Sequence, residues 1–74
     1  INLPAPEKIL DVGCGPGNST EVLQQRWPKS TLFGLDSDSA MLETASKSGI
    51  VAEWILADAG NWNPLQQFDL IFSN

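Results

Sequence analysis

Apolar and polar positions along this chain follow two periods, one typical of buried strands and one typical of helices. Short apolar runs bounded by Gly, Pro, Asn or Asp predict strands at 8–12, 31–35, 51–56 and 68–72. After the first and second runs, apolar positions recur at helical spacing, which predicts two helices. Such an alternation of strand and helix periods predicts an α/β fold, with a parallel sheet, flanking helices and right-handed crossovers.

Capping and helix-terminating residues define where the two predicted helices begin and end. Asn18 is the expected N-cap of the first helix, with Glu21 at capping-box spacing, and Pro28 closes it. Its expected apolar-side positions are Val22, Leu23, Arg26 and Trp27. The second helix has cap candidates at 37–39 and a C-terminal glycine, Gly49. Its expected apolar face consists of Met41, Leu42 and Ala45.

Polar residues or glycines follow each of the four predicted strands. They are the glycine cluster 13–17, Asp36, Asp58 and Asn74. In open parallel sheets, ligands bind beyond the carboxyl ends of the strands, where these features would meet. The sequence therefore predicts one ligand site at that edge, and it assigns the intervening stretch 59–67, rich in turn residues, to a loop.

The run 11–17, Asp-Val-Gly-Cys-Gly-Pro-Gly, carries the strongest chemical signal. Its glycines permit a tight turn and a close approach of backbone to ligand. A dinucleotide-binding loop would place its third glycine at position 18, where this chain has Asn18, and no Walker-type Gly-Lys-Ser/Thr follows. The spacing favours a ligand without phosphates and disfavours a dinucleotide-dependent oxidoreductase.

Charge and composition exclude several classes of partner. The 74 residues carry a net charge of −5, and the four basic residues form no stripe, so nucleic acid is not an expected partner. No apolar run approaches the roughly 20 residues that span a bilayer, and no secretory signal is visible. Cys14 is the one cysteine and the chain contains no His to activate it, so we interpret it as a small packing residue. A cytoplasmic location is expected.

Four segments together resemble the motifs of class I S-adenosylmethionine-dependent methyltransferases. They are Ile9–Gly17, Phe33–Leu42, Ala57–Ala59 and Phe68–Asn74, in the family's order and spacing. The resemblance implies a Rossmann-like fold, of which this chain would form the N-terminal half, and S-adenosylmethionine (SAM) as the cofactor, with S-adenosylhomocysteine (SAH) as its product. Gly17–Thr20, Gln25–Pro28 and Phe68–Asn74 further resemble members that methylate trans-aconitate. That likeness implies a small-molecule carboxylate as acceptor and a methyl ester as product.

The resemblance implies binding roles at the methionine end of the cofactor. Asp11 would orient this end through water and the loop amides. The backbone of the turn would line the methionine moiety, through Gly13, Cys14, Gly15 and Gly17. Asn74 would offer its carbonyl to the cofactor's amino group.

At the adenosine end, the same resemblance implies that Asp36 accepts both ribose hydroxyls, a charge-assisted pair of hydrogen bonds. Asp58 would accept from the adenine amino group, and the Ala59 amide would face the ring. Ser37 and Met41 are expected walls of the adenosine pocket. Plainer readings stay open, since Asp11 could cap the glycine turn and Asp58 could be an ordinary turn aspartate. We assign no catalytic residue and no metal ligand.

Two further expectations concern the protein as a whole. We expect residues 1–74 to be part of a longer enzyme, truncated after the fourth strand, because so short a chain buries a thin core. Alone, it should be marginally stable and inactive, with the acceptor site elsewhere. A non-catalytic methyltransferase-like binding module is the main alternative. Binding of SAH, but not of NAD, would favour the transferase over an oxidoreductase.

Overall fold

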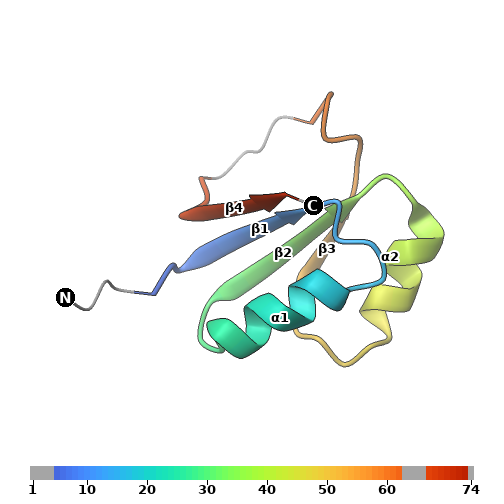
Figure 1. The fold of residues 1–74 in the computed structure, drawn as a ribbon. Helices are drawn as coiled ribbons and strands as arrows, with labels where there is room; N and C mark the ends of the chain where they lie inside the picture. Colours follow the sequence, from blue (N-terminus) through green and yellow to red (C-terminus); the bar gives the residue numbers. More distant parts are fainter. Residues whose placement is uncertain (1–4, 63–66, 74) are drawn as a thin grey trace.

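The computed structural model describes residues 5–62 and 67–73, which form one parallel sheet and two helices (Figure 1). The elements are β1 (Lys8–Val12), α1 (Asn18–Arg26), β2 (Thr31–Asp36), α2 (Ser39–Ser46), β3 (Glu53–Leu56) and β4 (Leu70–Ser73). The sheet order is β3-β2-β1-β4, and every neighbouring pair is parallel. The α/β prediction from the sequence is therefore confirmed.

The two faces of the sheet bury different apolar clusters. Both helices lie on one face (Figure 1), where Ile9 and Leu32 pack with Leu23 of α1. On the other face, the buried side chains are Leu10, Phe33 and Leu35, against which Trp62 and Phe68 pack. Successive side chains of a strand point to opposite faces, so neighbouring residues of β1 and β2 divide between the two clusters.

The third and fourth strands are shorter than the sequence predicts. β3 begins at Glu53, which lies opposite Phe33 of β2, and Val51 before it is 80% exposed. β4 begins at Leu70, because Phe68 lies outside the strand with its ring against Phe33, at 5.1 Å between centroids. Val51 and Phe68 are apolar, as strand residues often are, which explains the prediction. Neither residue belongs to the paired segments of the sheet.

An aspartate fastens the start of β4 to the start of β1. Asp69 Oδ2 accepts the backbone N–H groups of Glu7 and Lys8, each at 2.9 Å. The Asp69 N–H in turn donates to the Lys8 carbonyl at 2.9 Å. Asp69 thus has a structural role at the amino-terminal edge of the sheet.

The start of α1 contradicts the predicted capping box. The N-cap is Gly17, in a left-handed conformation with φ 105°, and no side chain caps the helix. Glu21 donates its N–H to the Gly17 carbonyl at 2.8 Å, so Asn18 already lies inside the helix. The prediction was wrong because the turn before α1, and not a side chain, sets where the helix begins.

The predicted apolar faces of both helices need correction, because Met41 of α2 and both Val22 and Arg26 of α1 are exposed. Leu42 and Ala45 of α2 are buried as expected, but Met41 is 40% exposed. Val22 of α1 is 63% exposed, whereas Leu23 is buried. Adjacent helical residues differ in direction by about 100°, so only one of each neighbouring pair can face the sheet. At the start of α2, the side chain of Asp38 accepts the N–H groups of residues 40 and 41.

Candidate cofactor-binding site

The glycine turn lies beyond the carboxyl end of β1 and is anchored to β2. Gly13, Gly15 and Gly17 have φ values of 73°, 58° and 105°, a left-handed region that other residues enter at a cost of about 1–2 kcal/mol. The N–H groups of Gly13 and Cys14 both donate to the Leu35 carbonyl, at 2.8 and 3.0 Å. A Cβ at Gly15 would meet nothing within 4 Å, so the turn has an open side there.

Asp36 joins this turn to the end of β2. Its Oδ2 accepts the Gly15 N–H at 2.9 Å, and its Oδ1 accepts the Asp38 N–H at 2.9 Å. An ionised carboxylate offers about four acceptor positions, so each oxygen retains capacity for a further donor. The side chain is partly buried and remains reachable from solvent. The structure thus places Asp36 against the glycine turn, at the sheet edge where the sequence predicts a ligand site.

Asp11 lies beneath the turn and is 1% exposed. Its Oδ2 accepts the hydroxyl protons of Ser19 and Thr20, each at 2.7 Å. These two hydroxyls were not predicted from the sequence to have a role. The signal available was their place in the first helical turn, directly after a glycine turn that follows a strand-end carboxylate. Asp11 therefore ties the end of β1 to the start of α1.

The carboxyl end of β3 brings a third aspartate to the same edge. Asp58 is exposed, and its Oδ1 accepts the Gly60 N–H at 2.9 Å, while its carbonyl accepts from Asn61 at 3.0 Å. These hydrogen bonds are those of an ordinary turn aspartate, the alternative that the sequence left open for Asp58. Ala59 within the turn is exposed.

The remaining predicted site residues are less constrained. Ser37 is exposed between β2 and α2, and Met41 lies in the first turn of α2 with its side chain partly in solvent. Both lie on the segment that follows Asp36. Asn74 lies outside the described residues.

Cys14 is buried in the centre of the turn, with 3% of its surface exposed. Its Sγ lies 3.6 Å from the Gly15 carbonyl oxygen. Burial, together with the nearby negative charges of Asp11 and Asp36, raises the pKa of the thiol to about 11. A thiol that stays protonated is a poor nucleophile, so the structure supports the reading of Cys14 as a packing residue.

The raised pKa of Cys14 yields a testable expectation. In the folded protein, iodoacetamide should alkylate Cys14 far more slowly at pH 8 than in urea, as followed by mass spectrometry of the Cys14 peptide. Because the folded-state pKa lies above the usual value of 9.0, the neutral thiol stabilises the fold below pH about 9. That contribution should be lost as the pH rises through about 11. Equal labelling rates in the folded and unfolded protein would contradict the assignment.

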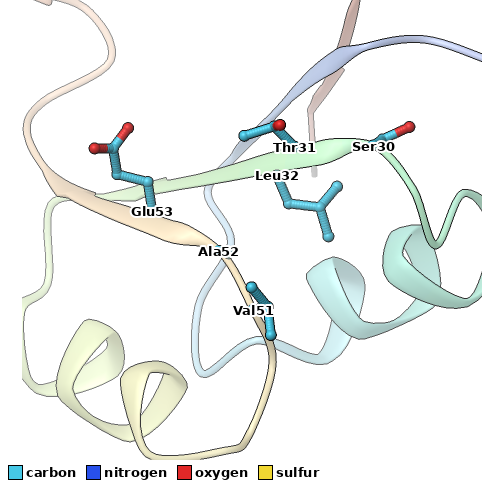
Figure 2. Close-up of a pocket in the computed structure, with 6 residues that line it drawn as sticks. All are labelled: Ser30, Thr31, Leu32, Val51, Ala52 and Glu53. Atoms are coloured by element: carbon cyan, nitrogen blue, oxygen red, sulfur yellow. The ribbon is translucent and has the colours of Figure 1, made fainter.

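A separate hollow lies at the opposite edge of the sheet (Figure 2). It has a volume of about 410 Å³ and is lined by Ser30, Thr31, Leu32, Val51, Ala52 and Glu53. These residues lie at the amino-terminal ends of β2 and β3, where β2 extends beyond its pairing with β3. Figure 2 shows the side chains of Leu32 and Glu53 pointing in different directions from the two neighbouring strands. The hollow is therefore separate from the glycine turn, which lies at the carboxyl edge.

The described residues contain neither a group of metal-ligating side chains nor a membrane-spanning helix. Within residues 5–62 and 67–73, no three His, Cys, Asp or Glu side chains are grouped so that they could hold a metal ion. Neither described helix has the length and apolar character needed to cross a membrane.

The parallel sheet, the glycine turn and the acid at the end of β2 define an α/β domain with a candidate ligand site at the carboxyl ends of its strands, and comparison with known families makes the class specific. Residues 9–74 match the family described as "Methyltransferase domain". The chain belongs to this family, the class I SAM-dependent methyltransferases.

Among curated relatives, trans-aconitate 2-methyltransferase of Escherichia coli K12 is 48% identical over all 74 residues. The same enzyme from Shigella flexneri is 47% identical over 74 residues. The chain spans 29% of the length of each of these relatives.

Solved structures share the fold. The plantazolicin methyltransferase BpumL in complex with SAH has a TM-score of 0.86 at 32% identity, over 95% of this chain and 28% of BpumL. A TehB-like SAM-dependent methyltransferase from Corynebacterium glutamicum has a TM-score of 0.81 at 30% identity, over 97% of this chain and 39% of that protein. The likeness confirms that the described strands and helices are the N-terminal part of the methyltransferase fold.

Proposed function

We propose that this chain forms the SAM-binding part of a longer enzyme that methylates a small carboxylic acid, such as trans-aconitate, to its methyl ester. The observation that carries the proposal is the contact between the glycine turn and Asp36, with an open side at Gly15. The 48% identity to trans-aconitate 2-methyltransferase over all 74 residues of this chain supports the acceptor class. The acceptor pocket would lie outside residues 1–74, since the relatives are more than three times longer.

The residues at this edge fit an adenosyl sulfonium compound. Its ribose diol presents two adjacent O–H donors, and Asp36 has two carboxylate oxygens with spare acceptor capacity. The space beside Gly15, which a Cβ would enter, suits a ligand in contact with the backbone. The carboxylates of Asp36 and Asp58 also favour a cationic ligand over a phosphate-bearing one.

Each predicted site residue then has a part in binding. Gly13, Cys14 and Gly15 would line the methionine moiety, and Gly17 would end the turn so that α1 can begin. Asp11 would hold the turn from beneath, since its bonds to the helix start fix the path of the chain. Residues that would border the adenosine are Ser37, Met41, Asp58 and Ala59. The backbone carbonyl of Asn74, the residue after the fourth predicted strand in the sequence, would accept a hydrogen bond from the cofactor's amino group.

Methyl transfer would depend on position more than on proton transfer. SAM supplies an electrophilic methyl group, and a carboxylate acceptor is already ionised near neutral pH, so no general base is needed. The turn and Asp36 would hold the donor in line with the acceptor and limit access of water. Accordingly, none of the described residues is assigned a chemical role beyond binding.

Calorimetry and an ester assay on the complete protein test this function. The protein should bind SAH and not NAD, and in the presence of SAM it should convert trans-aconitate to a product one methyl group heavier, detected by mass spectrometry. Binding of SAH without turnover of any small carboxylic acid would contradict the acceptor class. Failure to bind SAH at all would contradict the cofactor site.

A further inference from the structure

Gly34 lies in the middle of β2, where steric crowding leaves no room for a larger residue. It pairs with Asp11 of β1 and with Trp54 of β3. Among the described glycines, the left-handed ones are Gly13, Gly15, Gly17 and Gly49, so the backbone of Gly34 places no demand for glycine. A Cβ at Gly34, however, would lie 2.4 Å from Cζ3 and 2.5 Å from Cε3 of Trp54, and 3.1 Å from Sγ of Cys14.

These distances place the indole of Trp54 across β2. Its six-membered ring covers the Cα of Gly34, on the face of the sheet that also carries the side chain of Asp11. The ring edge and the sulfur of Cys14 approach the same point above Gly34. Trp54 of the outer strand of the described sheet and Cys14 of the glycine turn thus both lie against the same face of Gly34.

Cys14 transmits this contact to the backbone of the turn. Its N–H donates to the Leu35 carbonyl, and its carbonyl accepts the N–H of Gly17 at 3.2 Å. The side chain is buried, so the turn cannot shift without moving the sulfur against its neighbours. Near Gly34, the side chain that lies on the same side as this sulfur is the large indole of Trp54.

We propose that Trp54 is a positioning residue for the cofactor-binding turn. The ring, admitted by Gly34, braces Cys14 and keeps the turn in the conformation that binds the cofactor. This inference rests on the proposed cofactor site and adds to it a residue of β3 that does not itself touch the ligand.

The variant Trp54→Leu removes the brace and leaves a void beside Cys14. If the binding-competent turn is then populated about a tenth of the time, the affinity for SAH falls about tenfold. Isothermal calorimetry on the complete protein measures this, and steady-state kinetics should show a raised KM for SAM with an unchanged KM for the acceptor.

The matched control is Trp27→Leu. Trp27 is also half-buried on the helix-bearing face, but it packs against the cluster of Ile9, Leu23 and Leu32 at the far end of α1. Both variants should lower the melting temperature, whereas only Trp54→Leu should weaken SAH binding. Equal loss of SAH affinity in both variants, or none in Trp54→Leu, would overturn the proposal. Absence of SAH binding by the wild-type protein would instead refute the cofactor site itself.

A second variant tests the contact from below. Gly34→Ala introduces the clashing Cβ and should weaken SAH binding by itself, because the ring must move away from the turn. In the double variant Gly34→Ala/Trp54→Leu, the Cβ meets no indole and only the Cys14 sulfur at 3.1 Å, so the added alanine should cause a smaller loss than it does in the wild-type background. Strictly additive losses in the two single variants and their combination would show that the ring and the turn are not coupled.

Discussion

Replacement of Asp36 by Ala should weaken the binding of SAH by about a hundredfold or more. Hydrogen bonds to a charged group contribute roughly 1.5–3 kcal/mol each, and the proposed contact with the ribose has two of them. The substitution also releases the N–H groups of Gly15 and Asp38. Isothermal calorimetry on the complete protein is the measurement.

Asp69→Ala is the matched control for Asp36→Ala. Asp69 likewise accepts two backbone N–H groups, but at the amino-terminal edge of the sheet, away from the turn. Both variants should lose some stability to unfolding, and Asp69→Ala should bind SAH as the wild type does. If Asp36→Ala retained wild-type affinity, Asp36 would be a structural residue only.

Replacement of Asp11 by Ala should lower the free energy of unfolding by about 3 kcal/mol, because two charge-assisted hydrogen bonds are lost. The consequence is greatest at Thr20, which is fully buried and would keep an unpaired hydroxyl, whereas the partly exposed Ser19 can turn to water. Urea denaturation of the complete protein, followed by circular dichroism, measures the loss.

Two further variants separate the buried pair from a general loss of packing. Thr20→Val should destabilise more than Ser19→Ala, since only the former removes a buried hydroxyl. The double variant Asp11→Ala/Thr20→Val should lose less than the sum of its parts, because neither partner is then left unsatisfied. Additive losses would refute the coupling between Asp11 and Thr20.

Much of the fold could be predicted because its signals are local. The strand at 8–12 and the strand at 31–35 are apolar runs bounded by breakers, and both match the structure to within one residue. The first residues of β3 and β4 could not be predicted in this way. Val51 and Phe68 are apolar like strand residues, but pairing with β2 and packing against Phe33 decide where these strands begin.

The candidate site likewise has features that the sequence predicts and features that depend on packing. The contact between Asp36 and the glycine turn could be expected, because the carboxyl ends of parallel strands meet at one edge. The bonds from Ser19 and Thr20 to Asp11, and the ring of Trp54 over Gly34, were not expected. They join residues whose orientation depends on how α1 and β3 pack on the sheet, which no spacing along the chain expresses.

By itself, the sequence determined the order of strands and helices, the three glycines of the turn and the acids at the strand ends. Those features act through neighbouring residues, so a linear pattern is enough to reveal them. Only the tertiary structure decided that Gly17 and not Asn18 caps α1, that Met41 faces outward, and which side chains support the turn. The physical reason is that caps, burial and support depend on distances between elements, which exist only once the sheet has formed.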